Sequence, residues 1–498
     1  MVAGWAGSCS PIHSDAKLSA SNRAHLLRSR ALPTNPADFS ATQLLAAYRS
    51  RSLSPVEVTQ AVLDRIAAWE PGLGALFAVD TVVALVAAKE AEQRWARGEP
   101  CGALDGVPIT IKDLIATKGD PVPLGTAATL LVPAAEDAPP AARVREAGAI
   151  IVGKTTMPDY GMLSSGLSTY HHLGRNPWNL ARTPGGSSGG AAAACAAGIG
   201  PLHIGTDIGG SVRLPAGWCG TFALKPSFGR VPVMPPYIGR VAGPMTRTVA
   251  DSALLMSVLS QPDWRDHMAL PAAHIAWDKL DCNLRGKRIG LMMRAGCGLN
   301  VEAEIAAVIQ GAAALFEEAG AIISPIEPFL TGQLLDGLDV FWRARFWPEI
   351  SALPPERRER VLPFIRQWAE GAQNATGADV YSGFDSIMRL RHLGNEMMRD
   401  LDFILSPTAP VAAFAAELPC PTNDPRRPFE HIAFTVPFNM TEQPAASINA
   451  GYTPDGLPIG LQIIGRRFDD LGVLQAAAAF ERMRSPQRPW PKALPGSP

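Results

Sequence analysis

A serine that follows a glycine turn is the residue of this 498-residue chain whose setting most favours catalysis. Ser211 stands within Thr206-Asp-Ile-Gly-Gly-Ser-Val-Arg-Leu-Pro215, where a strand expected over residues 202–206 enters two glycines and then a short helix. Such a turn exposes a hydroxyl and gathers backbone N–H groups, as a nucleophile beside an oxyanion hole requires. A helix N-cap is the alternative role, although capping would not need both glycines.

A second serine lies in a glycine-rich segment. Residues 184–190 read Pro-Gly-Gly-Ser-Ser-Gly-Gly and precede an alanine-rich helix expected over residues 191–197. In isolation, this composition is typical of a flexible linker. Here the small side chains of the helix permit close backbone packing, and the glycines permit backbone conformations that other residues resist. We therefore interpret Ser187 as part of a packed site.

A serine nucleophile needs a base, and the sequence offers two candidates. His203 lies on the strand that leads to Ser211, and a core or surface role is the simpler expectation for it. Lys112 ends a strand expected over residues 106–112, where a solvated position is the usual one. If Lys112 is buried instead, desolvation lowers its pKa and lets the neutral amine accept a proton.

Together these residues resemble the amidase signature family. The segment Gly186–Ala216 follows the family signature, and Leu104–Leu114 matches the block that carries the family's catalytic lysine. Further similar blocks are Arg175–Asn179, Cys219–Pro226, Phe434–Asn439 and Asp455–Gly465. The likeness covers residues 39–485 and is weak only over 270–400. The resemblance implies an amidase signature fold.

The resemblance also implies a Ser–cisSer–Lys triad. By position, Ser211 is the nucleophile, Ser187 the bridging serine on a cis peptide bond after Gly186, and Lys112 the base. It implies that the backbone N–H groups of four residues hold the oxyanion: Ile208, Gly209, Gly210 and Ser211. Supporting residues are Gly186, Thr206, Asp207 and Arg213.

Two residues depart from the family pattern. Thr156 stands where many members have Asn, and Ile208 where many have Gly, so the pocket near the oxyanion is expected to differ in shape. For the substrate pocket we expect Tyr160, Met162 and Leu163 to form an apolar acyl site, with ordinary core positions as the alternative. Aromatic residues of the 330–380 stretch are expected to form a helical lobe over the site.

Hydrophobic periodicity predicts an α/β fold, in which strands alternate with helices. With the resemblance, this becomes a large mixed β-sheet covered by helices on both faces. Further strands are expected over 149–153, 288–292, 321–326, 403–406, 445–449 and 459–464. Helices are expected over 54–66, 82–95, 140–147, 301–319, 384–399 and 469–482.

The predicted organisation is one amidase signature domain over residues 39–490, with a variable helical lobe at about 300–400. Residues 1–38 are expected to be a disordered or mis-started extension, with a transit peptide as the alternative.

Composition excludes several classes of protein. The formal net charge is −1, which argues against a nucleic-acid footprint. No apolar run is long enough to span a bilayer. Seven scattered cysteines with no CxxC spacing favour a reducing, cytoplasmic setting. We expect no metal and no cofactor, and a homodimer is left open.

The predicted function is the hydrolysis of small, largely uncharged amides. One alternative is the glutaminase subunit of a tRNA-dependent amidotransferase, although residues 388–394 (Met-Arg-Leu-Arg-His-Leu-Gly) do not match that subunit's Arg-Arg-Ile block. Another is a non-catalytic binding protein on the same scaffold. Gly148–Thr155 also fits the nucleotide-binding pattern GxxxxGK[ST], but its middle reads Ala-Ile-Ile-Val. We therefore predict a buried strand there.

Overall fold

The computed structural model describes residues 33–494, and those from Asn35 onward belong to one compact unit. Most of the extension predicted over residues 1–38 therefore lies outside the described residues. Its last part is the short 3-10 helix η1 (Pro36–Asp38), whose N-terminus the Asn35 side chain caps.

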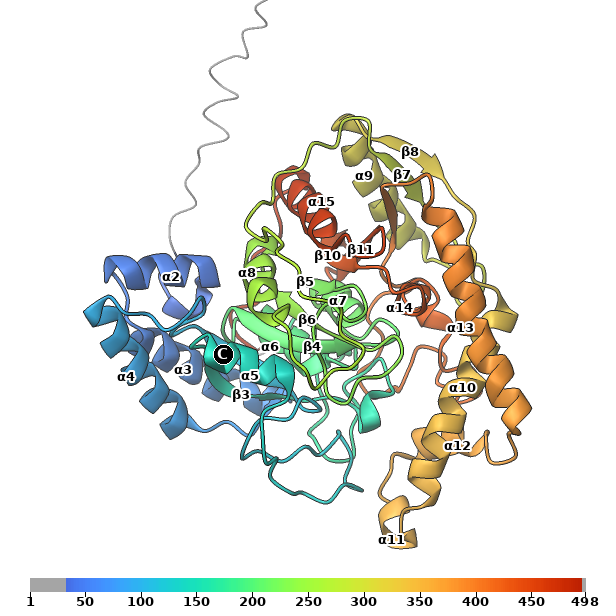
Figure 1. Cartoon of the computed structure of the whole chain (residues 1–498), viewed down its shortest axis with the longest axis horizontal. Coiled ribbons are helices and arrows are strands. Elements are labelled where there is room, and N and C mark those ends of the chain that lie inside the picture. Colours follow the sequence, from blue (N-terminus) through green and yellow to red (C-terminus); the bar gives the residue numbers. More distant parts are fainter. Residues whose placement is uncertain (1–32, 495–498) are drawn as a thin grey trace, which may run out of the picture. The chain divides into compact units, whose positions relative to one another are not determined.

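A single mixed sheet organises the described residues (Figure 1). Its eleven strands run in the order β1-β3-β2-β4-β6-β5-β10-β11-β9-β7-β8. β2 is parallel to β3 and β4, β7 is parallel to β8 and β9, and the other pairs are antiparallel. The strands are β1 (Leu76–Phe77), β2 (Pro108–Lys112), β3 (Ile150–Thr155), β4 (Leu202–Asp207), β5 (Phe222–Lys225), β6 (Val241–Thr246), β7 (Arg288–Leu291), β8 (Ile322–Pro325), β9 (Phe403–Pro407), β10 (Ala445–Tyr452) and β11 (Pro458–Gly465).

Helices cover both faces of the sheet. They are α2 (Ala41–Ser50), α3 (Pro55–Leu73), α4 (Thr81–Arg97), α5 (Pro139–Glu146), α6 (Gly189–Ala197), α7 (Arg213–Cys219), α8 (Val249–Leu259), α9 (Ala303–Glu318), α10 (Gly332–Ser351), α11 (Pro355–Arg358), α12 (Pro363–Glu370), α13 (Gly377–Met398), α14 (Pro437–Met440) and α15 (Asp470–Met483). Two short 3-10 helices complete the set, η2 (Asp159–Gly161) and η3 (Glu430–Ile432).

Alternate residues of β9 show why the sheet is covered on both sides. Phe403 and Leu405 join a hydrophobic core with residues of α8, α9 and α15, whereas Ile404 joins a second core with residues of α7, α10 and α13. Successive side chains of a strand point to opposite faces, so these two cores lie on opposite sides of the sheet. The α/β fold predicted from the sequence is confirmed.

A lobe of three helices stands over the second core. α10, α12 and α13 pack together, and α13 contacts α14 (Figure 1). Trp342 and Phe346 of α10 are buried there with Trp368 of α12. α13 begins at Gly377, earlier than predicted, because Thr376 and Asp379 form a capping box at that point.

Three strands escaped prediction. β6 contains Gly243-Pro244, and proline and glycine within a run argue against a strand. Gly243 faces the backbone of β5 so closely that a side chain would clash with the Leu224 carbonyl. β5 and β1 are too short to show a clear alternation.

The nucleotide-loop pattern forms a strand, as predicted. β3 extends through Lys154 and Thr155, so no helix begins at the lysine. The Lys154 ammonium is buried and donates to the Ile115 carbonyl at 2.9 Å. The segment therefore offers no cradle of free amides for a phosphate.

Candidate active site

Lys112 lies at the centre of a cluster of hydroxyl groups. It ends β2, and Thr206 lies near the end of the parallel neighbour β4, so both side chains reach the same edge of the sheet. The Lys112 Nζ donates to Ser187 Oγ at 2.8 Å, to Ser188 Oγ at 2.9 Å and to Thr206 Oγ1 at 2.9 Å. Three hydroxyl partners use all three donors of an ammonium group.

The lysine has no exposed surface and no carboxylate among these partners. Burial, reinforced by the positive charge of Arg240, lowers the pKa of Lys112 to about 7, against the opposing charges of Asp207 and Asp113. Near neutral pH a substantial fraction of Lys112 is therefore uncharged and able to accept a proton.

Ser187 is held by the turn that precedes α6. The peptide bond between Gly186 and Ser187 is cis, and Ser187 is 3% exposed. A Cβ on Gly186 would lie 2.6 Å from the carbonyl oxygens of Leu163 and Ser165, so only glycine fits there. The glycine-serine segment is thus a packed turn and not a linker.

Ser188 was not among the predicted site residues, yet it contacts the lysine directly. Its Oγ accepts from Lys112, donates to the Thr206 carbonyl at 3.1 Å and accepts from the Thr206 N–H at 3.2 Å. Its own N–H donates to the Ser211 carbonyl at 3.1 Å, which ties the two serine segments together. The adjacent Ser-Ser pair was the only signal in the sequence.

Ser211 is half-buried on the turn between β4 and α7, where it lines a pocket. Asp207 holds this turn by accepting the Gly210 N–H at 2.8 Å and the Val212 N–H at 3.1 Å. Gly210 has a φ of 130°, a conformation that side-chain-bearing residues rarely adopt.

The four predicted oxyanion donors are not equivalent. The Gly210 N–H is already bonded to Asp207. Across residues 33–494, the N–H groups of Ile208, Gly209 and Ser211 have no hydrogen-bond acceptor. These three amides, and not Gly210, are the ones that have a donor to offer a substrate.

A buried ion pair stabilises the turn that carries Ser211. The Arg213 guanidinium bonds both oxygens of Asp207, from Nε at 3.0 Å and from Nη2 at 2.9 Å, and both side chains are fully buried. The other Arg213 N–H groups donate to the Thr435 carbonyl, the Gln462 side chain and the Asn439 side chain. The Asn439 amide also donates to the Asp207 carboxylate. Burial alone would raise the pKa of Asp207, but Arg213 outweighs it and the pKa falls well below its usual range.

His203, the other candidate base, is part of the core. It is fully buried, and its Nδ1 lies 2.8 Å from Thr110 Oγ1. Burial lowers the pKa of His203 to about 3, so the imidazole is neutral. Of the core and surface positions expected for this histidine, the structure shows the core position.

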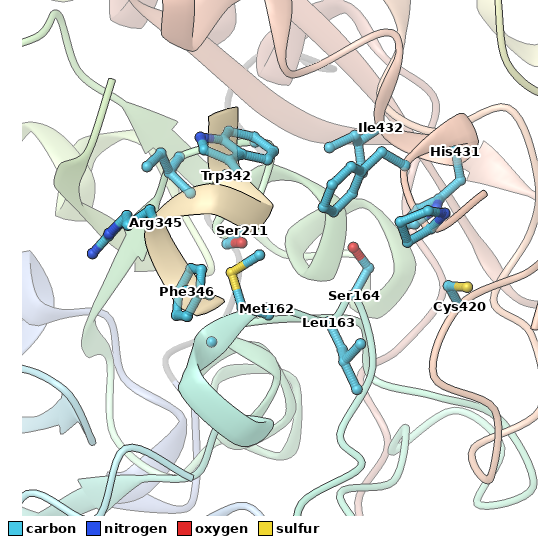
Figure 2. Close-up of a pocket in the computed structure, with 15 residues that line it drawn as sticks. Met162, Leu163, Ser164, Ser211, Trp342, Arg345, Phe346, Cys420, His431 and Ile432 are labelled. Atoms are coloured by element: carbon cyan, nitrogen blue, oxygen red, sulfur yellow. The ribbon is translucent and has the colours of Figure 1, made fainter. Parts of the chain in front are cut away.

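The pocket beside Ser211 is lined mainly by apolar side chains and measures about 540 Å³, including space open to solvent (Figure 2). Met162 and Leu163, two of the three residues predicted to form an acyl site, line it. Ile208 also lines it. Residues that the sequence did not single out as lining include Phe429, His431 and Ile432, which come from the segment before α14.

Tyr160 and Thr156, which the sequence analysis related to the shape of the pocket, lie outside its lining. Tyr160 packs its ring edge-on against Phe346, with ring centres 6.0 Å apart, and Phe346 in turn lines the pocket. Thr156 instead donates to the Gly74 carbonyl at 2.8 Å. Of the two differences from the family pattern, the one at Thr156 therefore affects backbone packing beside α6, while the one at Ile208 affects the pocket itself.

Over residues 33–494, no cluster of three or more His, Cys, Asp or Glu side chains is placed to hold a metal ion. Within the same range, no helix has the length and apolar character needed to cross a membrane.

Comparison with known proteins places this geometry in a family. A family model described as Amidase matches residues 57–474. An acylamidase of Rhodococcus erythropolis is 34% identical over 92% of this chain and 97% of its own length. One of the subunits of the glutamyl-tRNA(Gln) amidotransferase of Chloroflexus aggregans is 33% identical over 88% of this chain and 94% of its own.

Solved structures agree. A bacterial aryl acylamidase of the amidase signature enzymes has a TM-score of 0.83 and 31% identity, covering 90% of this chain and 96% of its own. A 6-aminohexanoate cyclic dimer hydrolase bound to substrate has a TM-score of 0.80 and 26% identity, covering 92% and 99%. The chain therefore belongs to the amidase family. It is an amide hydrolase with the amidase signature fold, as the resemblance implied.

Proposed function

We propose that the chain cleaves the C–N bond of small carboxylic amides through an acyl-enzyme on Ser211. The observation that carries this proposal is the environment of Lys112, which is buried among three hydroxyl oxygens and has a lowered pKa. A neutral amine 2.8 Å from Ser187 can act as a general base through that hydroxyl.

In the first half-reaction, the Ser211 oxygen attacks the amide carbonyl carbon and forms a C–O bond. The Ser211 proton passes to Ser187, while the Ser187 proton passes to Lys112. The carbonyl oxygen becomes an oxyanion, which the free N–H groups of Ile208, Gly209 and Ser211 stabilise. Loss of one such donor costs about 3–4 kcal/mol of barrier.

Collapse of this intermediate breaks the C–N bond. Lys112 returns its proton through Ser187 to the departing nitrogen, so that a neutral amine or ammonia leaves. Water then attacks the acyl carbon, and its proton follows the same path to Lys112. When the second intermediate collapses, the proton returns to Ser211, and the carboxylic acid is released.

The pocket supports an amide with an apolar acyl or aryl part. Its lining includes Trp342, Phe346 and Phe429. Aromatic and aliphatic side chains favour apolar ligand groups, with a few polar groups fixing their orientation. Two of the matched proteins are called an acylamidase and an aryl acylamidase.

The proposal is tested by incubating the purified protein with acetanilide and with hexanamide and measuring aniline or ammonia release. We expect release without added partner protein. Ser211→Ala should abolish it, and Lys112→Met should reduce it by at least about 10³-fold. Lys118→Met, at an exposed position of the following loop, is the matched control and should be neutral. Full activity in Ser211→Ala would refute the mechanism.

The similarity to amidotransferase subunits supports a second candidate, release of ammonia from glutamine. The lining favours the first candidate, because the ammonium group of glutamine needs an anionic partner and none of the fifteen lining residues is an aspartate or a glutamate. Glutamine hydrolysis that appears only when other amidotransferase subunits are added would favour the second.

A further inference from the structure

One charged side chain stands in the otherwise uncharged wall of the pocket. Among the fifteen lining residues shown in Figure 2, Arg345 is the only arginine, lysine, aspartate or glutamate. It is partly exposed, on α10. A single charged group in an apolar pocket is a strong determinant of which ligands bind.

Stacking, and not an ion pair, holds the Arg345 guanidinium. Its central carbon lies 3.7 Å from the centre of the Tyr237 ring and 5.0 Å from that of Phe346. Across residues 33–494, Arg345 makes no ion pair with a carboxylate. Stacking on a ring face leaves the N–H groups in the guanidinium plane available to a ligand.

Arg343, two residues earlier on the same helix, shows the contrast. It pairs with Asp339 at 2.7 Å and donates to the carbonyls of Trp368 and Pro425. Those contacts join α10 to α12 and to the segment before α14. Arg343 is therefore a structural residue, whereas Arg345 contacts the rings of Tyr237 and Phe346 and the Tyr237 hydroxyl.

A second arginine adds positive charge at the same place. Arg240 is partly buried, donates to the Pro235 carbonyl at 3.1 Å, and makes no ion pair within the described chain. Its charge acts on Lys112, and the charge of Arg345 acts on it in turn. The nearby carboxylate is Glu349, which is exposed. Two cations thus face one anion beside the catalytic lysine.

We infer that Arg345, with Arg240 beside it, binds a carboxylate of the substrate, so that the preferred substrates are amides that also carry an acid group. This inference rests on the proposed function and narrows its substrate class. It departs from the largely uncharged amides predicted from the sequence. The near-neutral net charge of −1 is compatible with both, because the charge of the whole chain does not report the charge of one pocket wall.

The chemistry of the two groups fits. A guanidinium presents paired N–H donors that match the two oxygens of a carboxylate, and such charge-assisted bonds are stronger than neutral ones. The apolar neighbours Phe346 and Trp342 reduce competition from water. The bound acid group would thereby fix the position of the amide relative to Ser211.

The test compares matched substrates. The mono-para-nitroanilides of succinic, glutaric and adipic acids place a carboxylate at different distances from the amide. Acetylated para-aminobenzoate places it on the amine side. The corresponding carboxamides are the neutral partners. We expect the wild type to prefer at least one acid over its carboxamide by about 10- to 100-fold in kcat/KM.

Arg345→Met should reduce that preference by about tenfold or more, with the larger loss of kcat/KM on the acid substrate. Arg389→Gln is the matched control, because it removes an exposed arginine of the same helical lobe outside the pocket. It should leave the preference unchanged. A wild type without preference, or a preference that survives Arg345→Met, would overturn the inference.

A binding measurement separates this inference from the proposed function. Ser211→Ala protein, titrated calorimetrically with the preferred acid anilide and its carboxamide, should bind the acid about tenfold more tightly. Ser211→Ala/Arg345→Met should bind both equally. If no amide is hydrolysed by the wild type, the proposed function fails, while equal binding by Ser211→Ala protein contradicts the carboxylate site.

Discussion

The buried ion pair between Asp207 and Arg213 supports a quantitative prediction. Asp207→Asn keeps the size of the side chain but leaves the Arg213 charge buried without an anion. Breaking a fully buried pair by removing one partner costs about 3–5 kcal/mol, because the remaining charge is uncompensated. The contacts of Arg213 with Thr435, Gln462 and Asn439 are neutral and offset only part of that cost.

The expected change in melting temperature is the lost free energy divided by the entropy of unfolding, which scales with the number of residues. About 460 described residues, at an unfolding entropy of about 2.1 cal/mol/K per residue, give about 1 kcal/mol/K. A loss of 3–5 kcal/mol therefore corresponds to a decrease of about 3–5 °C. Asp207 also anchors the N–H groups of Gly210 and Val212, so kcat should fall as well.

The assay is differential scanning calorimetry of the wild type, Asp207→Asn, Arg213→Met and the double variant. The double variant should lose less free energy of unfolding than the two single variants lose together, because it removes both charges. Arg145→Gln is the control. It breaks a partly exposed pair with Asp137, in which the arginine side chain is 49% exposed, and should lower the free energy of unfolding by no more than about 1 kcal/mol. An Asp207→Asn effect no larger than this control would refute the reasoning.

Two further predictions concern the lysine. The ratio kcat/KM should rise with pH through about 7 as Lys112 loses its proton, since only the neutral amine can draw the Ser211 proton through Ser187. Because the charge of Arg240 lowers the pKa of Lys112, Arg240→Met should move this limb to higher pH, and a profile that is flat between pH values of about 5.5 and 9 would contradict the assignment. Ser188→Ala removes one of three hydroxyl partners of Lys112 and should lower kcat by about tenfold, with KM little changed, in steady-state kinetics. An unchanged kcat would show that Ser188 does not position the lysine.

The sequence was most informative where function depends on local order. Ser211 could be singled out because its strand, glycine turn and helix are contiguous, and Ser187 because its glycines are unusual inside a domain. The position of Lys112 on a strand followed from alternation. That this lysine is buried against Ser187 and Thr206 could not follow from spacing alone, since these contacts cross 75 and 94 residues of chain.

Longer-range features of the site were not predictable from the sequence. Thr435, Asn439 and Gln462, which bond Arg213 beside Asp207, lie more than 200 positions away in the chain, and only the fold brings them together. The Gly210 N–H belonged to the predicted oxyanion donors, but its bond to Asp207 depends on the local shape of the turn. The pocket wall likewise combines two separate parts of the chain. One is α10, which lies in the 270–400 stretch where the likeness to the family is weak, and the other is the segment before α14.

The central claim is that Ser211 carries the acyl group, with Lys112 drawing its proton through Ser187. The most direct measurement is rapid acid quenching during turnover of a slowly hydrolysed para-nitrophenyl ester or anilide, followed by peptide mapping by mass spectrometry. We predict an increase in mass by one acyl group on the peptide that contains Ser211, at a level that Lys112→Met lowers sharply. An acyl group on any other residue, or undiminished acylation in Lys112→Met, would contradict the claim.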